Sequence, residues 1–283
     1  MALQVEAQST PFGREARSHD GKRVIIYEKL GHVAVIEMDD PPANTYTHEM
    51  MRQLDEVILD ARFDSDVEVI VLTGKGSKFF SAGANIGMLN SVSPEFKYMF
   101  CLHANETLSR LEQTPKLVIA ALNGHTVGGG LEIAMACDIR IARRDSGKMG
   151  LPEVGLGVLP GTGGTARLAR LVGKSRAIEL MVSGRTFSFE QSLEYGMISD
   201  IYDGEGDDFR EQILTYAKQF TTPHKAPMAV GLIKRSVQSG TEMPLEGALT
   251  LERELQAQLF KSGDAKEGIA AYNDKRTARF TNH

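Results

Sequence analysis

A glycine-rich stretch from Leu122 to Gly164 constrains this chain more than any other segment, because it holds eleven glycines. A short apolar run rich in branched side chains, residues 116–122, comes before it and predicts a buried strand. Three consecutive glycines, 128–130, are followed at once by a helical pattern, LEIAMA. We therefore expect these glycines at a helix N-terminus, where unpaired backbone N–H groups and the helix dipole favour an anion or a developing oxyanion.

Two acidic residues accompany this turn. Glu132 falls in the first turn of the predicted helix, and Glu153 lies in a second segment punctuated by glycine and proline. Each has an ordinary explanation: an acid in the first turn complements the helix dipole, and an acid in a loop is usually solvated. The combination of both acids with the glycine turn is what favours a catalytic site.

Composition excludes several classes of protein. With 283 residues, 42% hydrophobic and 24% charged, the chain is typical of a soluble globular protein. Its length allows one large domain, or a main domain with a smaller appendage. A net charge of −5 disfavours a nucleic-acid surface. The two cysteines, Cys101 and Cys137, indicate a reducing compartment, and no apolar run approaches the ~20 residues of a membrane span. We expect a cytoplasmic protein that binds no membrane.

The order of predicted elements indicates an α/β core followed by helices alone. Residues 1–22 are polar and patternless, and we expect a peripheral tail. Strands and helices alternate over residues 23–205, whereas residues 206–283 show only helical patterns. The seven histidines are scattered without a paired spacing, so no metal site is expected. The helices expected in the last part cover 207–221, 226–238, 243–261 and 264–280.

Five segments resemble the crotonase superfamily, and specifically the enoyl-CoA hydratases. The similarity covers residues 23–283, and its two central segments are the most specific. In this sequence the segments are PPANT at 41–45, SAGANI at 81–86, NGHTVGGGLEIAMACDIRIA at 123–142, GLPEVGLGVLPGTGGTARLARLVG at 150–173 and EGIAAYNDKRTARF at 267–280.

The resemblance implies a spiral of ββα repeats with a helical C-terminal subdomain used for trimer contacts, and a homotrimer or a dimer of trimers. It places the oxyanion-hole N–H groups on Ala82 and Gly129 and the catalytic acids on Glu132 and Glu153. It implies no cofactor, since coenzyme A is part of the acyl-CoA substrate. Asn85 departs from the aspartate that the family often has there. The positions implied to contact substrate or CoA are Pro42, Ala43, Ser81, Ala84, Asn85, Ile86, Tyr272 and Lys275.

The predicted reaction is addition of water to a 2-trans-enoyl-CoA thioester through an enolate. In this hypothesis Glu153 is the main acid and base, while Glu132 orients and activates the water. Two alternatives remain. An enoyl-CoA isomerase or another crotonase-type acyl-CoA enzyme usually keeps an acid at the Glu153 position only, so both glutamates favour hydration. A non-catalytic oligomer that binds CoA or RNA is the alternative of another class, and the acidic balance disfavours RNA.

Overall fold

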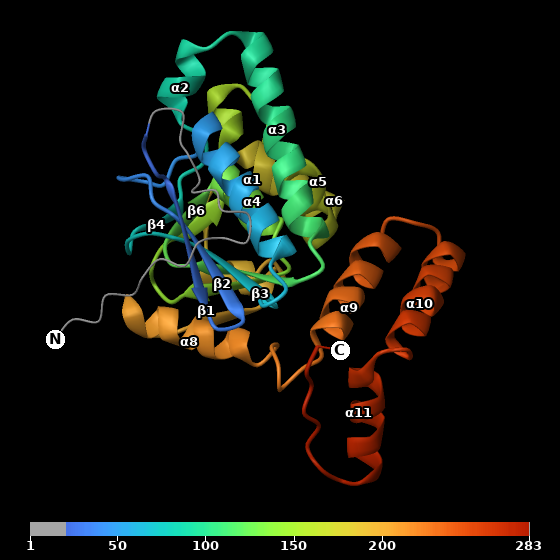
Figure 1. The fold of residues 1–283 in the computed structure, drawn as a ribbon. Helices are drawn as coiled ribbons and strands as arrows, with labels where there is room; N and C mark the ends of the chain where they lie inside the picture. The colour runs from blue at the N-terminus through green and yellow to red at the C-terminus, as the bar shows by residue number, and fades with distance from the viewer. Residues whose placement is uncertain (1–20, 283) are drawn as a thin grey trace, which may run out of the picture.

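The computed structural model describes residues 21–282 and contains two β-sheets surrounded by helices (Figure 1). The larger sheet has the strand order β1-β2-β3-β5-β7-β10, and the smaller has the order β4-β6-β8-β9. The larger-sheet strands are β1 (Ile25–Leu30), β2 (Val33–Met38), β3 (Val69–Gly74), β5 (Leu117–Leu122), β7 (Ile139–Arg143) and β10 (Asp200–Tyr202). The smaller-sheet strands are β4 (Phe79–Ser81), β6 (His125–Val127), β8 (Lys148–Gly150) and β9 (Phe187–Ser188).

From β3 to β8, successive strands alternate between the two sheets, and this alternation produces the spiral. β3, β5 and β7 pair in parallel within the larger sheet, and each is followed by a strand of the smaller sheet, β4, β6 or β8. Helices then return the chain for the next turn of the spiral. The predicted α/β fold with ββα repeats is therefore confirmed. The strands of the smaller sheet have only two or three residues, which is too short for a periodic pattern, and for that reason the sequence did not reveal them.

Helices α1 (His48–Phe63) and α3 (Pro94–Gln113) cover one side of the larger sheet and form the main core with it. Helix α1 begins after Thr47, whose side chain accepts a hydrogen bond from the Met50 N–H. Its apolar face packs into the main core together with α3. The remaining helices of this region are α2 (Ile86–Ser91), α4 (Gly129–Met135), the 3-10 turn η1 (Glu153–Leu156), α5 (Gly164–Val172), α6 (Lys174–Ser183) and α7 (Phe189–Glu194).

Helix α8 (Asp207–Lys218) belongs to the core and not to a separate C-terminal unit. It lies along the opposite side of the larger sheet (Figure 1), where Phe209, Ile213 and Ala217 join a second apolar cluster with residues of β2, β3, β5 and β7. The expected boundary at residue 206 is therefore wrong. A run of helical patterns does not distinguish a helix that covers a sheet from one that leaves it.

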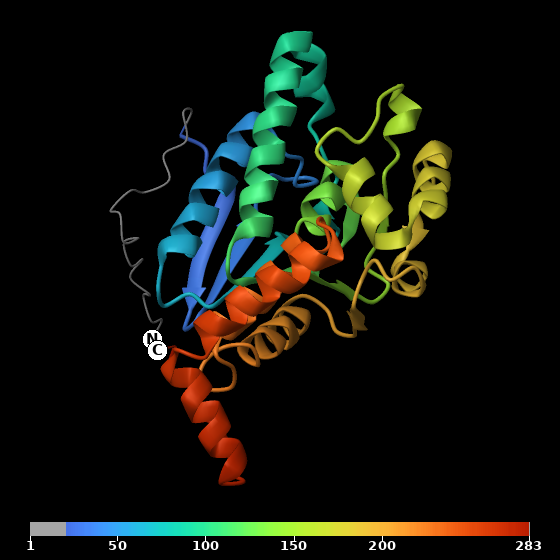
Figure 2. The ribbon, with the colours of Figure 1, turned by 90° about the vertical axis from the view of Figure 1, so that its right-hand side faces the viewer.

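The part that leaves the core consists of α9 (Pro227–Gly240), α10 (Leu245–Leu259) and α11 (Gly263–Asn273), and we call it the C-terminal arm (Figures 1 and 2). Helix α9 is fixed to the core by a buried ion pair, in which Lys234 Nζ lies 2.8 Å from an Asp138 carboxylate oxygen. Gly231 allows close approach, since a Cβ there would lie 2.3 Å from the Pro115 carbonyl oxygen.

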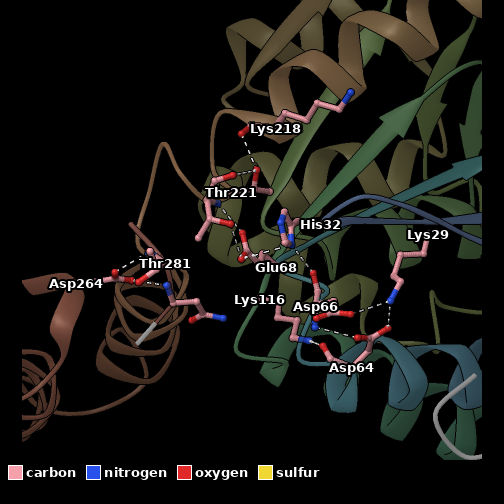
Figure 3. Close-up of polar contacts among 12 residues, drawn as sticks. Lys29, His32, Asp64, Asp66, Glu68, Lys116, Lys218, Thr221, Asp264 and Thr281 are labelled. Atoms are coloured by element: carbon pink, nitrogen blue, oxygen red, sulfur yellow. Dashed lines mark hydrogen bonds and ion pairs between the residues drawn. The ribbon is translucent and has the colours of Figure 1, made fainter. Parts of the chain in front are cut away.

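A buried carboxylate, Glu68, holds the connection between α8 and the arm (Figure 3). It accepts hydrogen bonds from the Thr222 N–H at 2.6 Å and the Thr222 hydroxyl at 3.0 Å. The His32 ring lies 3.6 Å from the same carboxylate. These contacts fix the position from which the arm departs.

The end of the chain folds back onto the start of α11. The helix expected over 264–280 is shorter, because α11 ends at Asn273 and Lys275 has a φ of 54°. The buried Asp264 carboxylate accepts hydrogen bonds from the N–H groups of Thr281 and Asn282, at 2.8 and 3.0 Å. Within residues 21–282, no helix has the length and apolar character needed to cross a membrane.

Removing the Glu68 carboxylate tests the connection to the arm. Glu68→Ala leaves the Thr222 N–H without its acceptor, so we expect a loss of about 1–3 kcal/mol in the free energy of unfolding, measured by urea denaturation. The matched control is Asp66→Ala, since the Asp66 side chain is 71% exposed and, within residues 21–282, pairs only with Lys29. Equal stability of the two variants would contradict this account.

Candidate active site

The site is built around the first turn of α4, where the backbone makes its closest approaches. Gly128 has a φ of 58° and turns the chain from β6 into the helix. A Cβ on Gly129 would lie 2.1 Å from the Tyr46 ring, and a Cβ on Gly130 would lie 2.2 Å from the Ser81 carbonyl oxygen. Glycine is thus required at all three positions, by conformation at the first and by packing at the others.

Two backbone N–H groups at this turn remain available to a ligand. Among the described residues, no hydrogen-bond acceptor contacts the N–H of Gly129 or that of Ala84. Gly83, with a φ of 88°, brings them together: a Cβ at position 83 would lie 2.8 Å from the Gly129 nitrogen. The Ala82 N–H instead donates to the Ala43 carbonyl at 3.0 Å. The expectation that Ala82 supplies an oxyanion donor is therefore wrong, because its N–H is already paired.

Glu132 is held rigidly by the start of α5. Its carboxyl group is 2% exposed, and Oε1 accepts hydrogen bonds from the Thr162 and Gly164 N–H groups, both at 2.7 Å. Burial raises the pKa of Glu132, while the hydrogen bonds from Gly164 and Thr162 act in the opposite direction. A Cβ on Gly164 would lie 2.8 Å from this oxygen. The carboxylate thus has one oxygen fixed by backbone amides.

Glu153 reaches the same turn from η1. Its Oε1 lies 3.0 Å from the place a Cβ on Gly128 would occupy, and its Oε2 is buried without a hydrogen-bond partner in the described part of the chain. Burial, with a smaller contribution from the charge of Glu132, raises the pKa of Glu153 to about 7. The structure therefore brings both predicted acids to the N-terminal turn of α4, where the charge of Glu132 acts on Glu153.

Two of the residues expected to contact CoA, Ser81 and Asn85, use their side chains for hydrogen bonds within the chain. The Ser81 side chain is fully buried, donates to the Asn44 carbonyl at 2.7 Å and accepts from the Gly83 N–H at 3.1 Å. Its hydroxyl is not open to a ligand, so the expectation for this side chain is wrong. Asn85 caps α2, because its Oδ1 accepts a hydrogen bond from the Met88 N–H at 2.9 Å. Asparagine serves this capping role without a charge.

The remaining expected contacts divide into two groups. Pro42 and Ile86 are exposed beside the turn that carries Ala84, and Ala43 is half-buried there. Tyr272, 84% exposed, lies on α11, which projects away from the core at the end of the arm (Figure 1). Lys275 follows it. Within one chain these last two residues are not brought to the glutamates, and their contact with CoA stays a prediction.

Sequence reasoning missed Tyr46. Its side chain is 3% exposed, its ring lies 5.5 Å from that of Phe100, and its hydroxyl is 3.0 Å from Thr162 Oγ1. The residue stands in a loop between a turn and a helix, where no periodicity marks a buried side chain. The importance of Tyr46 is indicated only by the packing of its ring against Gly129, and this contact is known only from the fold.

No group of three or more His, Cys, Asp or Glu side chains within residues 21–282 is arranged to hold a metal ion. The donors at the site are instead backbone N–H groups, and the titratable groups are two carboxyls. Such a set can stabilise a negative oxygen and transfer protons to and from carbon and water.

Comparisons with known proteins agree with this geometry. Residues 28–283 match the family described as enoyl-CoA hydratase/isomerase. A short-chain-enoyl-CoA hydratase of Clostridium acetobutylicum is 36% identical over 89% of this chain and 95% of its own length. A crotonyl-CoA hydratase of Syntrophomonas wolfei is 33% identical over 90% and 97%. The crystal structure of an enoyl-CoA hydratase from Geobacillus kaustophilus has 43% identity and a TM-score of 0.89, and the match covers 93% of this chain and 98% of that one.

The chain belongs to the enoyl-CoA hydratase/isomerase family. Both the predicted superfamily and the predicted class of enzyme, a hydro-lyase of the enoyl-CoA hydratase type, are thereby confirmed.

The tight packing at Gly164 gives a test of how Glu132 is held. In Gly164→Ala the new methyl group would lie 2.8 Å from the Glu132 carboxylate and 2.7 Å from Pro160 Cβ, so the carboxylate must move. We expect hydratase turnover to fall about 100-fold, the scale of a misplaced catalytic group. Gly155→Ala is the control, since a Cβ there meets nothing within 4 Å. Retained turnover in Gly164→Ala would refute the stated role of this contact.

Proposed function

We propose that this enzyme adds water to a 2-trans-enoyl-CoA thioester, with the thioester oxygen held by the N–H groups of Ala84 and Gly129. The observation that carries the proposal is that two unpaired backbone donors lie at the same site as two glutamates, of which Glu132 is buried and Glu153 is half-buried. The relatives whose names specify hydration of enoyl-CoA or crotonyl-CoA support the same reaction.

The two backbone donors lower the barrier by favouring the transition state over the substrate. As water adds at C3, negative charge moves onto the thioester oxygen to form an enolate. Fixed N–H groups bind that charged oxygen more strongly than the neutral carbonyl, and loss of one such donor typically costs about 2.7–4 kcal/mol in activation free energy. Because both donors are on rigid glycine turns, no reorganisation is needed during the reaction.

The two glutamates divide the proton transfers, and together they carry one proton. The ionised Glu132 takes a proton from water while the water oxygen bonds to C3, and the protonated Glu153 gives its proton to C2. The product is a 3-hydroxyacyl-CoA, and the proton now on Glu132 returns to Glu153 before the next turnover. A pKa near 7 suits Glu153 to this exchange at neutral pH.

We further propose that CoA is the only coenzyme involved, as part of the substrate, and that the enzyme works in the cytoplasm. The arm supports assembly into a homotrimer or a dimer of trimers, in which Tyr272 and Lys275 contact CoA bound to a neighbouring chain. Exposed apolar side chains on all three arm helices favour this arrangement, and they include Ile233, Val237, Leu249, Phe260 and Ile269. Sedimentation equilibrium measures the assembly directly.

Substitution of each glutamate tests the proposed function. We expect Glu132→Gln and Glu153→Gln each to lower kcat by about 10²–10⁴-fold while CoA affinity stays nearly the same, because each removes one proton carrier. The assay follows loss of the enoyl-thioester absorbance of crotonyl-CoA. The control is Glu56→Gln, on the partly exposed surface of α1. If only Glu153→Gln is impaired, an isomerase-type proton shuttle replaces hydration; if neither is impaired, the site assignment is wrong.

The pH dependence follows from the single shared proton. Above the pKa of about 7 the pair loses its proton, so kcat/KM for hydration should fall as the pH rises through that value. Hydration neither releases nor consumes protons overall, so kcat/KM for dehydration must show the same alkaline limb. Parallel rate measurements in both directions check this. A flat profile between about pH 6 and pH 9 would exclude the shared-proton mechanism.

A further inference from the structure

We infer that Tyr46 is a positioning residue for the hydration reaction, joining both oxyanion donors and Glu132 into one rigid unit. The inference rests on the proposed function, and it concerns a residue that touches none of the reacting atoms. Three parts of Tyr46 contact three parts of the site: its backbone, its ring and its hydroxyl.

The backbone of Tyr46 fixes the Ala84 donor from both sides. The Tyr46 N–H donates to the Gly83 carbonyl at 3.0 Å, and the Tyr46 carbonyl accepts from the Asn85 N–H at 3.0 Å. Ala84 lies between these two anchored neighbours. Its N–H therefore cannot change direction unless at least one of the two bonds breaks.

The ring of Tyr46 fixes the position of the Gly129 N–H group by packing against Gly129. It lies directly against Gly129, since a Cβ there would be 2.1 Å from the ring carbon Cε1 and 2.5 Å from the hydroxyl oxygen. Phe100 packs beside the Tyr46 ring, with ring centroids 5.5 Å apart. The ring is thus held in the core, and the first turn of α4 rests on it.

The hydroxyl of Tyr46 reaches Glu132 through Thr162. The Tyr46 hydroxyl is 3.0 Å from Thr162 Oγ1, and the Thr162 N–H donates to Glu132 Oε1 at 2.7 Å. Thr162 thus links Tyr46 to Glu132, with its hydroxyl toward the Tyr46 hydroxyl and its N–H toward the Glu132 carboxylate. Burial keeps the pKa of Tyr46 well above its usual range, so this contact is not lost by ionisation of the phenol.

These contacts bear on which glutamate holds the shared proton. Burial raises the pKa of Glu132, and the hydrogen bonds from the Thr162 and Gly164 N–H groups oppose that effect by favouring the ionised form. By holding Thr162 in place, the Tyr46 hydroxyl preserves one of these donors and so favours Glu132 as the acceptor of the water proton. The shared proton then resides on Glu153, whose Oε2 has no competing partner in the described part of the chain.

The test is Tyr46→Phe, which keeps the ring and the backbone contacts and removes only the hydroxyl. With crotonyl-CoA we expect kcat to fall about three- to tenfold, the effect of one hydrogen bond, with little change in KM. The acid limb of kcat/KM should move to higher pH by about half a unit or more, because Glu132 then binds a proton more readily. Tyr27→Phe is the matched control, because it removes a buried hydroxyl that has no partner among the described residues and lies on β1.

Variants of Thr162 separate this role from simple packing. Thr162→Ser keeps the hydroxyl and should retain the wild-type pH profile, whereas Thr162→Val should lose at least as much turnover as Tyr46→Phe. Adding Tyr46→Phe to Thr162→Val should cause no further loss, because the chain is already broken. A Tyr46→Phe enzyme with wild-type kcat, or with lower kcat but an unmoved acid limb, would overturn the inference. Failure of the wild-type enzyme to hydrate crotonyl-CoA, or full activity of Glu132→Gln, would instead overturn the proposed function.

Discussion

The structure depends on the close approach of two backbone segments, the turn at Gly83 and the start of α4 at Gly128–Gly130. No side chain fits between them: a Cβ at Gly83 would lie 2.8 Å from the Gly129 nitrogen, and one at Gly130 would lie 2.2 Å from the Ser81 carbonyl. The two sheets of the spiral bring these segments together, because β4 and β6 are parallel neighbours that end at the same edge. The fold thus produces two adjacent free N–H groups, and the chemistry follows from their position.

The same arrangement explains how two carboxyl groups at one helix turn differ in behaviour. Burial raises the pKa of both carboxyl groups, to about 7 for Glu153, but two backbone hydrogen bonds oppose this effect at Glu132. Glu153 Oε2 is buried without a partner among the described residues. The two side chains are chemically identical, and they differ in the hydrogen bonds that their surroundings supply.

Much of the fold was predictable from the sequence, because long periodic segments determine their own structure. The cap at Thr47, the buried strand before the glycine turn and the helix carrying Glu132 all follow from local rules. Contacts between distant segments were not predictable. The pairing of the Ala82 N–H with the Ala43 carbonyl moves the oxyanion donor to Ala84, and the place of Tyr46 over Gly129 depends on the assembled fold. Helix α8 was assigned to the wrong unit for the same reason.

Two buried polar contacts fix the direction of the C-terminal arm relative to the core. Its first helix is fixed by the buried pair of Lys234 and Asp138, and its connection to α8 by the carboxylate of Glu68. A charge buried with its partner tolerates little displacement, so the arm keeps one direction in the isolated chain. In the proposed oligomer, a second chain would therefore meet a preorganised surface, whose conformational entropy was mostly lost during folding.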